Sequence, residues 1–135
     1  MTRLTLRLDF ANGSQIGPGK IRLLEAIADT GSIAAAGRSM GMSYRRAWLL
    51  VDQINRAFSQ PAVTGQTGGS GGGGTALTDW GRELVALYRQ VEAESRTANA
   101  TALVRMEGML GAAGGVSRQP TPVPPVAAMP PHPID

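Results

Sequence analysis

The period of hydrophobic and polar positions changes along the first thirty residues. From position 3 to 10, leucine and phenylalanine alternate with charged or polar residues, which is typical of a strand with one buried face. After a turn at 11–13, apolar residues recur at helical spacing until Thr30 and Gly31, and Pro18 suits the first turn of that helix. The repeating positions of this first helix are Ile21, Leu24, Ile27 and Ala28.

Two further helices are predicted on either side of a glycine. Ser32 is a suitable N-cap for a helix from Ile33 to Met40, whose alanines at 34–36 permit close approach by a neighbour. Gly41 can adopt the left-handed conformation that ends a helix, and Ser43 caps the next one. On this third helix we place Ala47, Val51, Ile54 and Phe58 on one face, and Tyr44, Arg45, Arg46, Leu49, Asp52 and Gln53 largely on others.

The following segment predicts a hairpin and a long helix. Positions 62–64 and 75–77 favour short strands around a run of six glycines and one serine at 68–74. Thr78 and Asp79 are typical of a helix start, because a side-chain oxygen and a negative charge both suit free N–H groups. The stripe of this last helix contains Trp80, Leu84, Leu87, Tyr88, Val91, Ala98 and Ala102. We expect it to reach Met106 or beyond.

These patterns predict a mainly α fold with a small β wing, that is, a winged helix-turn-helix with a long C-terminal dimerisation helix. Residues 1–77 form the winged helix-turn-helix DNA-binding domain, 78–107 the dimerisation helix, and 108–135 a tail rich in proline, glycine and alanine. Seven of the nine prolines lie between Pro120 and Pro133, where no period is visible. We expect the tail to be disordered.

Composition narrows the function. The 135 residues include no cysteine and one histidine, His132, which we expect to be solvated in the tail. We find no set of nucleophile, base and orienting group, and we predict no enzyme, metal or cofactor. No targeting segment or membrane span is expected, so the predicted location is a reducing cytoplasm.

Positive charge is concentrated in the first part of the chain. Residues 1–76 carry eight basic and four acidic side chains, a net charge of +4, whereas 77–107 carry four basic and five acidic ones, a net charge of −1. Every basic residue except Lys20 is an arginine. Arginine is suited to phosphates and base edges, so this distribution favours a nucleic-acid partner.

Arg45 and Arg46 are the candidate base-reading residues. They lie in the first turn of the third helix, where a recognition helix enters the major groove, and a bidentate arginine–guanine contact contributes about 1–3 kcal/mol of discrimination. A plain helical hairpin with two solvated arginines is the alternative. For Trp48 we favour packing against a neighbouring element over stacking on nucleic acid.

The glycine run has three interpretations. Positions 69–74 match GxGxxG formally, but any polyglycine does, and no strand–loop–helix unit surrounds them, so we reject a dinucleotide site. Composition alone favours a flexible linker. The flanking β-like segments favour the tip of a two-stranded wing, in which backbone N–H groups approach phosphates.

Several motifs occur together in a specific order. They are Gly31-Ser32-Ile33, Ala35-Ala36, the string 41–48 (GMSYRRAW), Asn55, the stretch 67–74, Leu77-Thr78, Gly81, Leu84 and Tyr88. Over roughly residues 1–95 the chain resembles the N-terminal winged helix-turn-helix of the ModE family of molybdate-responsive bacterial regulators, which are distant relatives of the LysR-type regulators. The resemblance implies transcription regulation by a homodimer on double-stranded DNA, with molybdenum homeostasis as the candidate process.

The resemblance also implies site residues. The DNA contacts carried over by position are Ser32, Ser43, Tyr44, Arg45 and Arg46, with Gly68, Gly69, Ser70, Gly71 and Gly72 in the wing. The dimer-interface residues are Trp80, Leu84, Leu87, Tyr88, Val91 and Ala98. Ser70 departs from a lysine common in the family wing. Family members continue into small β-barrel domains that bind molybdate, whereas only the tail follows here, so we expect no small-molecule ligand in this chain.

A second hypothesis remains open. An amphipathic helix at the end of a small domain needs a partner to cover it. The chain is then a protein-interaction module that pairs with a longer regulator through this helix and binds little DNA itself.

Overall fold

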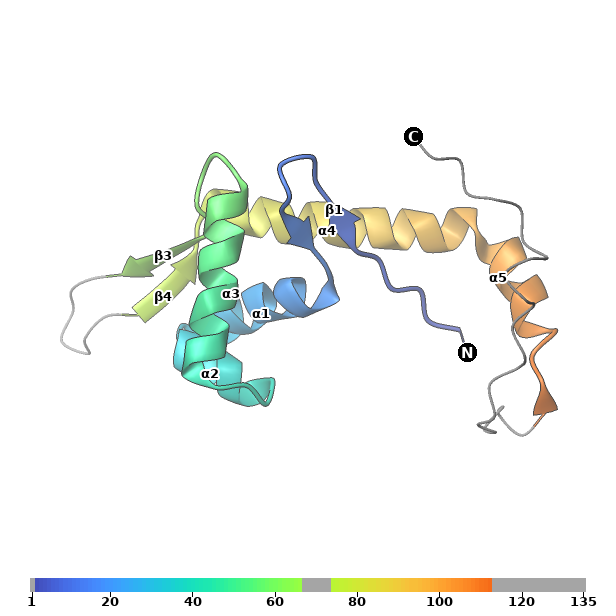
Figure 1. Ribbon diagram of the computed structural model, residues 1–135, viewed down its shortest axis with the longest axis horizontal. Coiled ribbons are helices and arrows are strands. Elements are labelled where there is room, and N and C mark those ends of the chain that lie inside the picture. Colours follow the sequence, from blue (N-terminus) through green and yellow to red (C-terminus); the bar gives the residue numbers. More distant parts are fainter. Residues whose placement is uncertain (1, 67–73, 113–135) are drawn as a thin grey trace, which may run out of the picture.

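The computed structural model describes residues 2–66 and 74–112. The elements are β1 (Leu8–Asp9), β2 (Gln15–Ile16), α1 (Pro18–Thr30), α2 (Ile33–Ser39), α3 (Tyr44–Ala57), β3 (Val63–Gln66), β4 (Gly74–Leu77), α4 (Asp79–Ala98) and α5 (Ala100–Glu107). Helices α1 to α3 and the β3–β4 hairpin gather at one end of the long α4, and α5 lies at its other end (Figure 1). This arrangement is a winged helix-turn-helix and confirms the predicted fold class.

The core lies where α1, α2 and α3 meet the start of α4. Its fully covered side chains include Leu23 of α1, which the helical pattern did not include, whereas the predicted Ala28 is exposed. The remaining buried apolar residues are Ile16, Ile21, Leu24, Ile27, Ala36, Ala47, Val51, Ile54, Ala62, Val63, Leu77, Leu84 and Tyr88. The buried face of α3 is therefore the predicted one, because Ala47, Val51 and Ile54 recur at helical spacing.

The crossing of α2 and α3 depends on one glycine. A Cβ at Gly37 would lie 3.1 Å from Ala47 Cβ and 3.3 Å from the Met42 carbonyl oxygen, so only glycine fits without a shift. Gly41 has φ of +72°, as predicted for the turn. The Oγ of Ser43 accepts a hydrogen bond from Arg46 N at 3.1 Å and thereby caps α3.

Asn55 joins α3 to the wing. Its side-chain oxygen accepts hydrogen bonds from Ala62 N and Val63 N, and its Nδ2 donates to the Val63 carbonyl oxygen. Strands β3 and β4 are antiparallel, with Val63 opposite Leu77. Thr75 N donates to the Gly31 carbonyl oxygen at 2.9 Å, which ties the hairpin to the end of α1. The base of the wing is therefore fixed to two helices.

The predicted N-terminal strand is much shorter than its pattern. Only Leu8–Asp9 pairs, with Gln15–Ile16, although burial alternates along the whole segment and Leu6 packs on the core. The phenolic hydroxyl of Tyr88 donates to the Leu6 carbonyl oxygen at 2.6 Å. The segment thus lies against α4 and has no partner strand over most of its length among the described residues.

The predicted long helix is divided in two at Asn99. Its Nδ2 and its backbone N both donate to the Ser95 carbonyl oxygen, at 2.8 and 3.1 Å. An asparagine side chain that competes for a helical carbonyl favours a helix end. The helix expected to reach Met106 is therefore α4 followed by the shorter α5, which turns away from the α4 axis (Figure 1).

Some predictions concern residues outside the described ranges. These are the predicted wing tip, with Gly68, Gly69, Ser70, Gly71 and Gly72, and the tail from position 113 onward, with His132. Within the described residues, no helix combines the length and the apolar character needed to cross a membrane.

Candidate nucleic-acid interface

The outward face of α3 carries large side chains that are not covered by the rest of the chain. Tyr44 is 57% exposed and Trp48 is 46% exposed, and Arg45 and Arg46 are exposed as well. Residues 44, 45 and 48 are separated by one, three and four positions, so they share a surface around the first turn of the helix. Two guanidinium groups and two aromatic rings are therefore presented to solvent at one end of α3.

Trp48 does not fit its sequence interpretation. The expectation that it packs against a neighbouring element is wrong within this chain, because nearly half of the side chain remains exposed. The physical reason is its position: the next residue toward the core face is the small Ala47, which alone fits beside Gly37 and is fully buried. The indole is rotated away from that contact.

The arginines near α3 differ in pairing. Arg56, at the end of the helix, forms an ion pair with Asp52, with Nε 2.9 Å from Oδ2. Arg38, Arg45 and Arg46 form no ion pair with any residue that the structure describes. An unpaired exposed guanidinium keeps its hydrogen-bond donors free for an external acceptor.

A basic groove lies beside the recognition helix. It is a surface hollow of about 570 Å³ between the β1–β2 turn and α3, and its cationic side chains are Lys20, Arg46 and Arg56. The other lining residues are Gly13, Ser14, Gln15, Leu50 and Gln53. The Nζ of Lys20 donates to the Gln15 carbonyl oxygen at 2.9 Å, and partial burial lowers the pKa of Lys20. The groove extends the positive surface of α3 toward the β1–β2 turn.

The sequence analysis missed Lys20, Gln53 and Arg56 as candidate contacts. Lys20 is the only lysine of the chain, and Gln53 and Arg56 are polar positions on α3 outside its buried face. No local pattern brings the β1–β2 turn beside α3. Only the packing of α1 against α3 does so.

Ser32 has a structural role at the start of α2. Its Oγ accepts a hydrogen bond from Ala35 N at 3.0 Å, and the side chain is half-buried. Ser43 has the same capping role in α3 but is exposed. Of the two predicted serine contacts, Ser43 is the one that lies on the open surface.

The predicted dimer-interface residues of α4 fall into two groups. Leu84 is 6% exposed and Tyr88 is 2% exposed, so their assignment to an interface is wrong: the core of the same chain already covers them. Trp80 is half-buried and stacks edge-on against Phe58, with ring centroids 5.2 Å apart.

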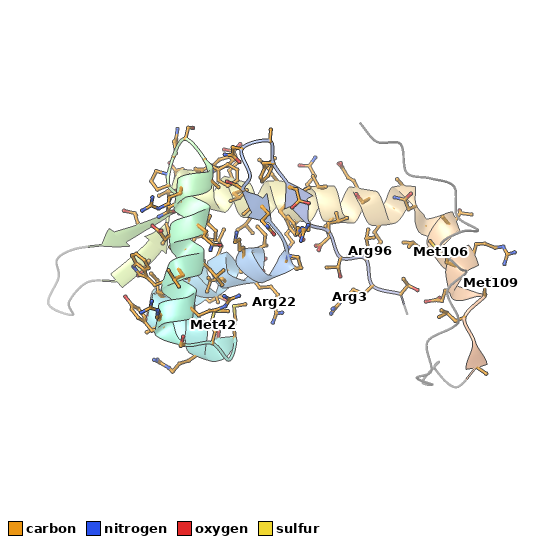
Figure 2. All side chains as sticks on the ribbon, viewed as in Figure 1. Arg3, Arg22, Met42, Arg96, Met106 and Met109 are labelled. Atoms are coloured by element: carbon orange, nitrogen blue, oxygen red, sulfur yellow. The ribbon has the colours of Figure 1, made fainter. Side chains whose placement is uncertain are left out.

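The other interface candidates remain on the surface. Leu87 is 43% exposed and Val91 is 41% exposed, and Ala98 is exposed near the end of α4. Helix α5 adds the exposed Val104 and Met106, which the sequence analysis did not assign to any site. An apolar surface thus follows the distal part of α4 into α5. Figure 2 shows Met106 and Met109 at this far end of the molecule.

The fold and the exposed arginines of its third helix define a winged helix-turn-helix protein. No family model matches the chain. It is 43% identical over 93 residues to the molybdenum transport protein ModE of Azotobacter vinelandii, which covers 69% of this chain and 34% of that protein. It is 40% identical over 112 residues to the molybdenum-pterin-binding protein MopA of Rhodobacter capsulatus, covering 83% of this chain and 38% of that protein.

A third relative is named for its DNA binding. The DNA-binding transcriptional dual regulator ModE of Escherichia coli K12 is 41% identical over 71 residues, covering 53% of this chain and 27% of that protein. The matched part of the chain belongs to the ModE family, as the sequence motifs indicated. The chain spans about a third of the length of these relatives.

Proposed function

We propose that this chain is a sequence-specific DNA-binding transcriptional regulator that acts as a homodimer on molybdenum-related genes. The observation that carries the proposal is the face of α3, where Arg45 and Arg46 are exposed and unpaired among the described residues. The names of the relatives support regulation and a link to molybdenum.

The proposed mode of binding follows from the surfaces described above. Helix α3 enters the major groove, so that Arg45 and Arg46 reach base edges and Tyr44 and Ser43 lie near the backbone. Lys20 and Arg56 in the basic groove meet phosphates beside the same helix. The hairpin β3–β4 is held beside α3 by Asn55, which supports a role for the wing on the adjacent backbone.

A second copy is proposed to cover the apolar surface of α4 and α5. Leu87, Val91, Ala98 and Val104 are uncovered in the single chain, and they continue from one helix to the next. A two-fold dimer then reads an inverted repeat, with half-sites separated by one or more helical turns of about 10 to 10.5 base pairs.

The first experiment selects bound fragments from genomic DNA and then measures affinity by mobility shift. Arg45→Ala and Arg46→Ala should each weaken binding to the selected site by roughly ten- to a hundredfold, because each removes a contact worth about 1–3 kcal/mol. Binding to scrambled duplex should fall much less. Arg105→Ala, which removes an exposed and unpaired charge from α5, is the matched control and should leave both affinities nearly unchanged.

Equal losses on selected and scrambled DNA would contradict base reading by these arginines. Loss of affinity in Arg105→Ala of the same size would indicate a general charge effect instead.

The second candidate, a module that pairs with a longer regulator, is favoured by the same exposed surface of α4 and α5. Light scattering on Leu87→Ser/Val91→Ser separates the two. The regulator proposal expects a wild-type dimer that dissociates in this variant and loses DNA affinity. A wild-type monomer without affinity for any duplex would favour the interaction module.

A further inference from the structure

A second group of arginines lies away from α3. Arg3 of the N-terminal segment, Arg22 of α1 and Arg96 of α4 all border one surface hollow of about 320 Å³. No residue lining this hollow lines the basic groove beside α3. Figure 2 labels the three arginines, which lie in this view between the helix-turn-helix and α5. We call this site the arginine hollow.

The three arginines have no counterions of their own. Within residues 2–66 and 74–112, the arginines that form ion pairs are Arg7, Arg56, Arg82 and Arg89. Arg3, Arg22 and Arg96 form none, and all three are exposed. Three like charges that converge from separate segments repel one another, and nothing within the described fold requires them there.

The fourth arginine of the hollow shows what the other three lack. Arg89 contacts Glu25 through Nε at 3.1 Å and Nη2 at 2.8 Å, and its Nη1 lies 2.7 Å from Glu92 Oε1. These contacts raise the pKa of Arg89. Glu92, which also lines the hollow, is thereby occupied with Arg89. The charge offered to an external ligand is that of Arg3, Arg22 and Arg96.

We propose that the arginine hollow binds a phosphoryl group. Guanidinium donors form paired, parallel hydrogen bonds to phosphate oxygens, and a phosphoryl group has both the several negative charges and the several acceptor atoms that three converging arginines need. The volume lies at the lower end of the range of small-ligand sites, about 300–1,000 Å³. The phosphoryl group belongs either to a free phosphate compound or to the DNA backbone.

The test titrates the full chain with inorganic pyrophosphate by calorimetry, against sodium chloride at matched ionic strength. The hollow variant is Arg3→Gln/Arg22→Gln/Arg96→Gln. The matched control is Arg38→Gln/Arg45→Gln/Arg46→Gln, which removes the same charge from three arginines near α2 and α3 that are also unpaired among the described residues. All six side chains are exposed, so both variants should keep the circular dichroism spectrum of the native fold.

Pyrophosphate affinity should fall about tenfold or more in the hollow variant and stay within about twofold in the control. The duplex arm identifies the source of the phosphoryl group. If the salt slope of duplex binding falls in the hollow variant by about 0.9 per lost contact, and more than in Arg105→Gln per charge removed, the source is the DNA backbone. If duplex binding is unchanged while pyrophosphate binding is lost, the source is a free compound.

Equal loss of pyrophosphate binding in the two triple variants would overturn the proposal. It would also be overturned if pyrophosphate gave no more heat than sodium chloride and the duplex slope stayed the same. The proposal does not depend on base reading by α3. A chain that binds pyrophosphate in the arginine hollow but no duplex would contradict the proposed function alone.

Discussion

Tyr44 at the start of α3 and Tyr88 in the middle of α4 have opposite surroundings. Tyr44 is more than half exposed, and none of the hydrogen bonds in the described part of the chain involves its hydroxyl. Tyr88 is almost fully buried and donates to the Leu6 carbonyl oxygen. Both lie on amphipathic helices with arginines beside them.

The difference teaches how the two helices are used. On α3 small residues face the core, and the large and charged residues are left outside. On the first half of α4 the large residues Leu84 and Tyr88 face the core, and only the later Leu87 and Val91 remain outside. An apolar stripe on a terminal helix therefore does not distinguish a core contact from an interface.

The junction at the start of α4 should give the largest effect. A Cβ at Gly81 would lie 2.1 Å from the Ala62 carbonyl oxygen, which is backbone and has little room to move. We expect Gly81→Ala to lower the free energy of unfolding by about 4 kcal/mol or more, measured by urea unfolding. Gly19→Ala, on the exposed first turn of α1 with no atom near its added Cβ, is the control and should be neutral or slightly stabilising.

The two leucines of α4 sharpen the comparison within one helix. Leu84→Ala should lower the free energy of unfolding by about 3 kcal/mol at every protein concentration, because it leaves a cavity in the chain's own core. Leu87→Ala should destabilise only at concentrations at which the chain dimerises. If both variants showed the same dependence on concentration, the distinction between core and surface positions of α4 would be wrong.

Tyr88→Phe should have a smaller effect, about 1–1.5 kcal/mol, from the loss of one hydrogen bond. Burial raises the pKa of Tyr88, and the Glu92 carboxylate acts in the same direction. The native state therefore holds the phenol proton more tightly than the unfolded chain, so stability falls as pH rises through the native pKa above 10. Unfolding curves between about pH 8 and 11 should show this fall in the wild type. A fall of equal size in Tyr88→Phe would contradict the assignment to Tyr88.

Much of the helix-turn-helix was predictable because its signals are local. Ser32 and Ser43 each cap the helix that follows them, and Gly31 and Gly41 both have the positive φ that ends a helix. These features depend on a few neighbouring residues only. The same holds for Thr78, whose Oγ1 accepts from Gly81 N at 3.0 Å.

The incorrect predictions depend on contacts between distant segments. The alternation at 3–10 gave the correct buried side of the segment, but no partner strand follows it beyond Leu8–Asp9 within the described residues. The burial of Leu84 and Tyr88 depends on the N-terminal segment and α1, which no spacing on α4 records. The convergence of Arg3, Arg22 and Arg96 is likewise a product of the tertiary fold. The break at Asn99 did have a local signal, the asparagine itself, which the apolar stripe concealed.

The hydrogen bond between Tyr88 and Leu6 joins positions 82 apart, and the one between Thr2 and Glu107 joins positions 105 apart. During translation, the first residues emerge from the ribosome long before either partner has been made. The contacts of α1 with α2 and α3 close much shorter loops and can form earlier. The N-terminal segment therefore takes its native place late in the synthesis of the chain, after the α1–α3 unit is already able to fold.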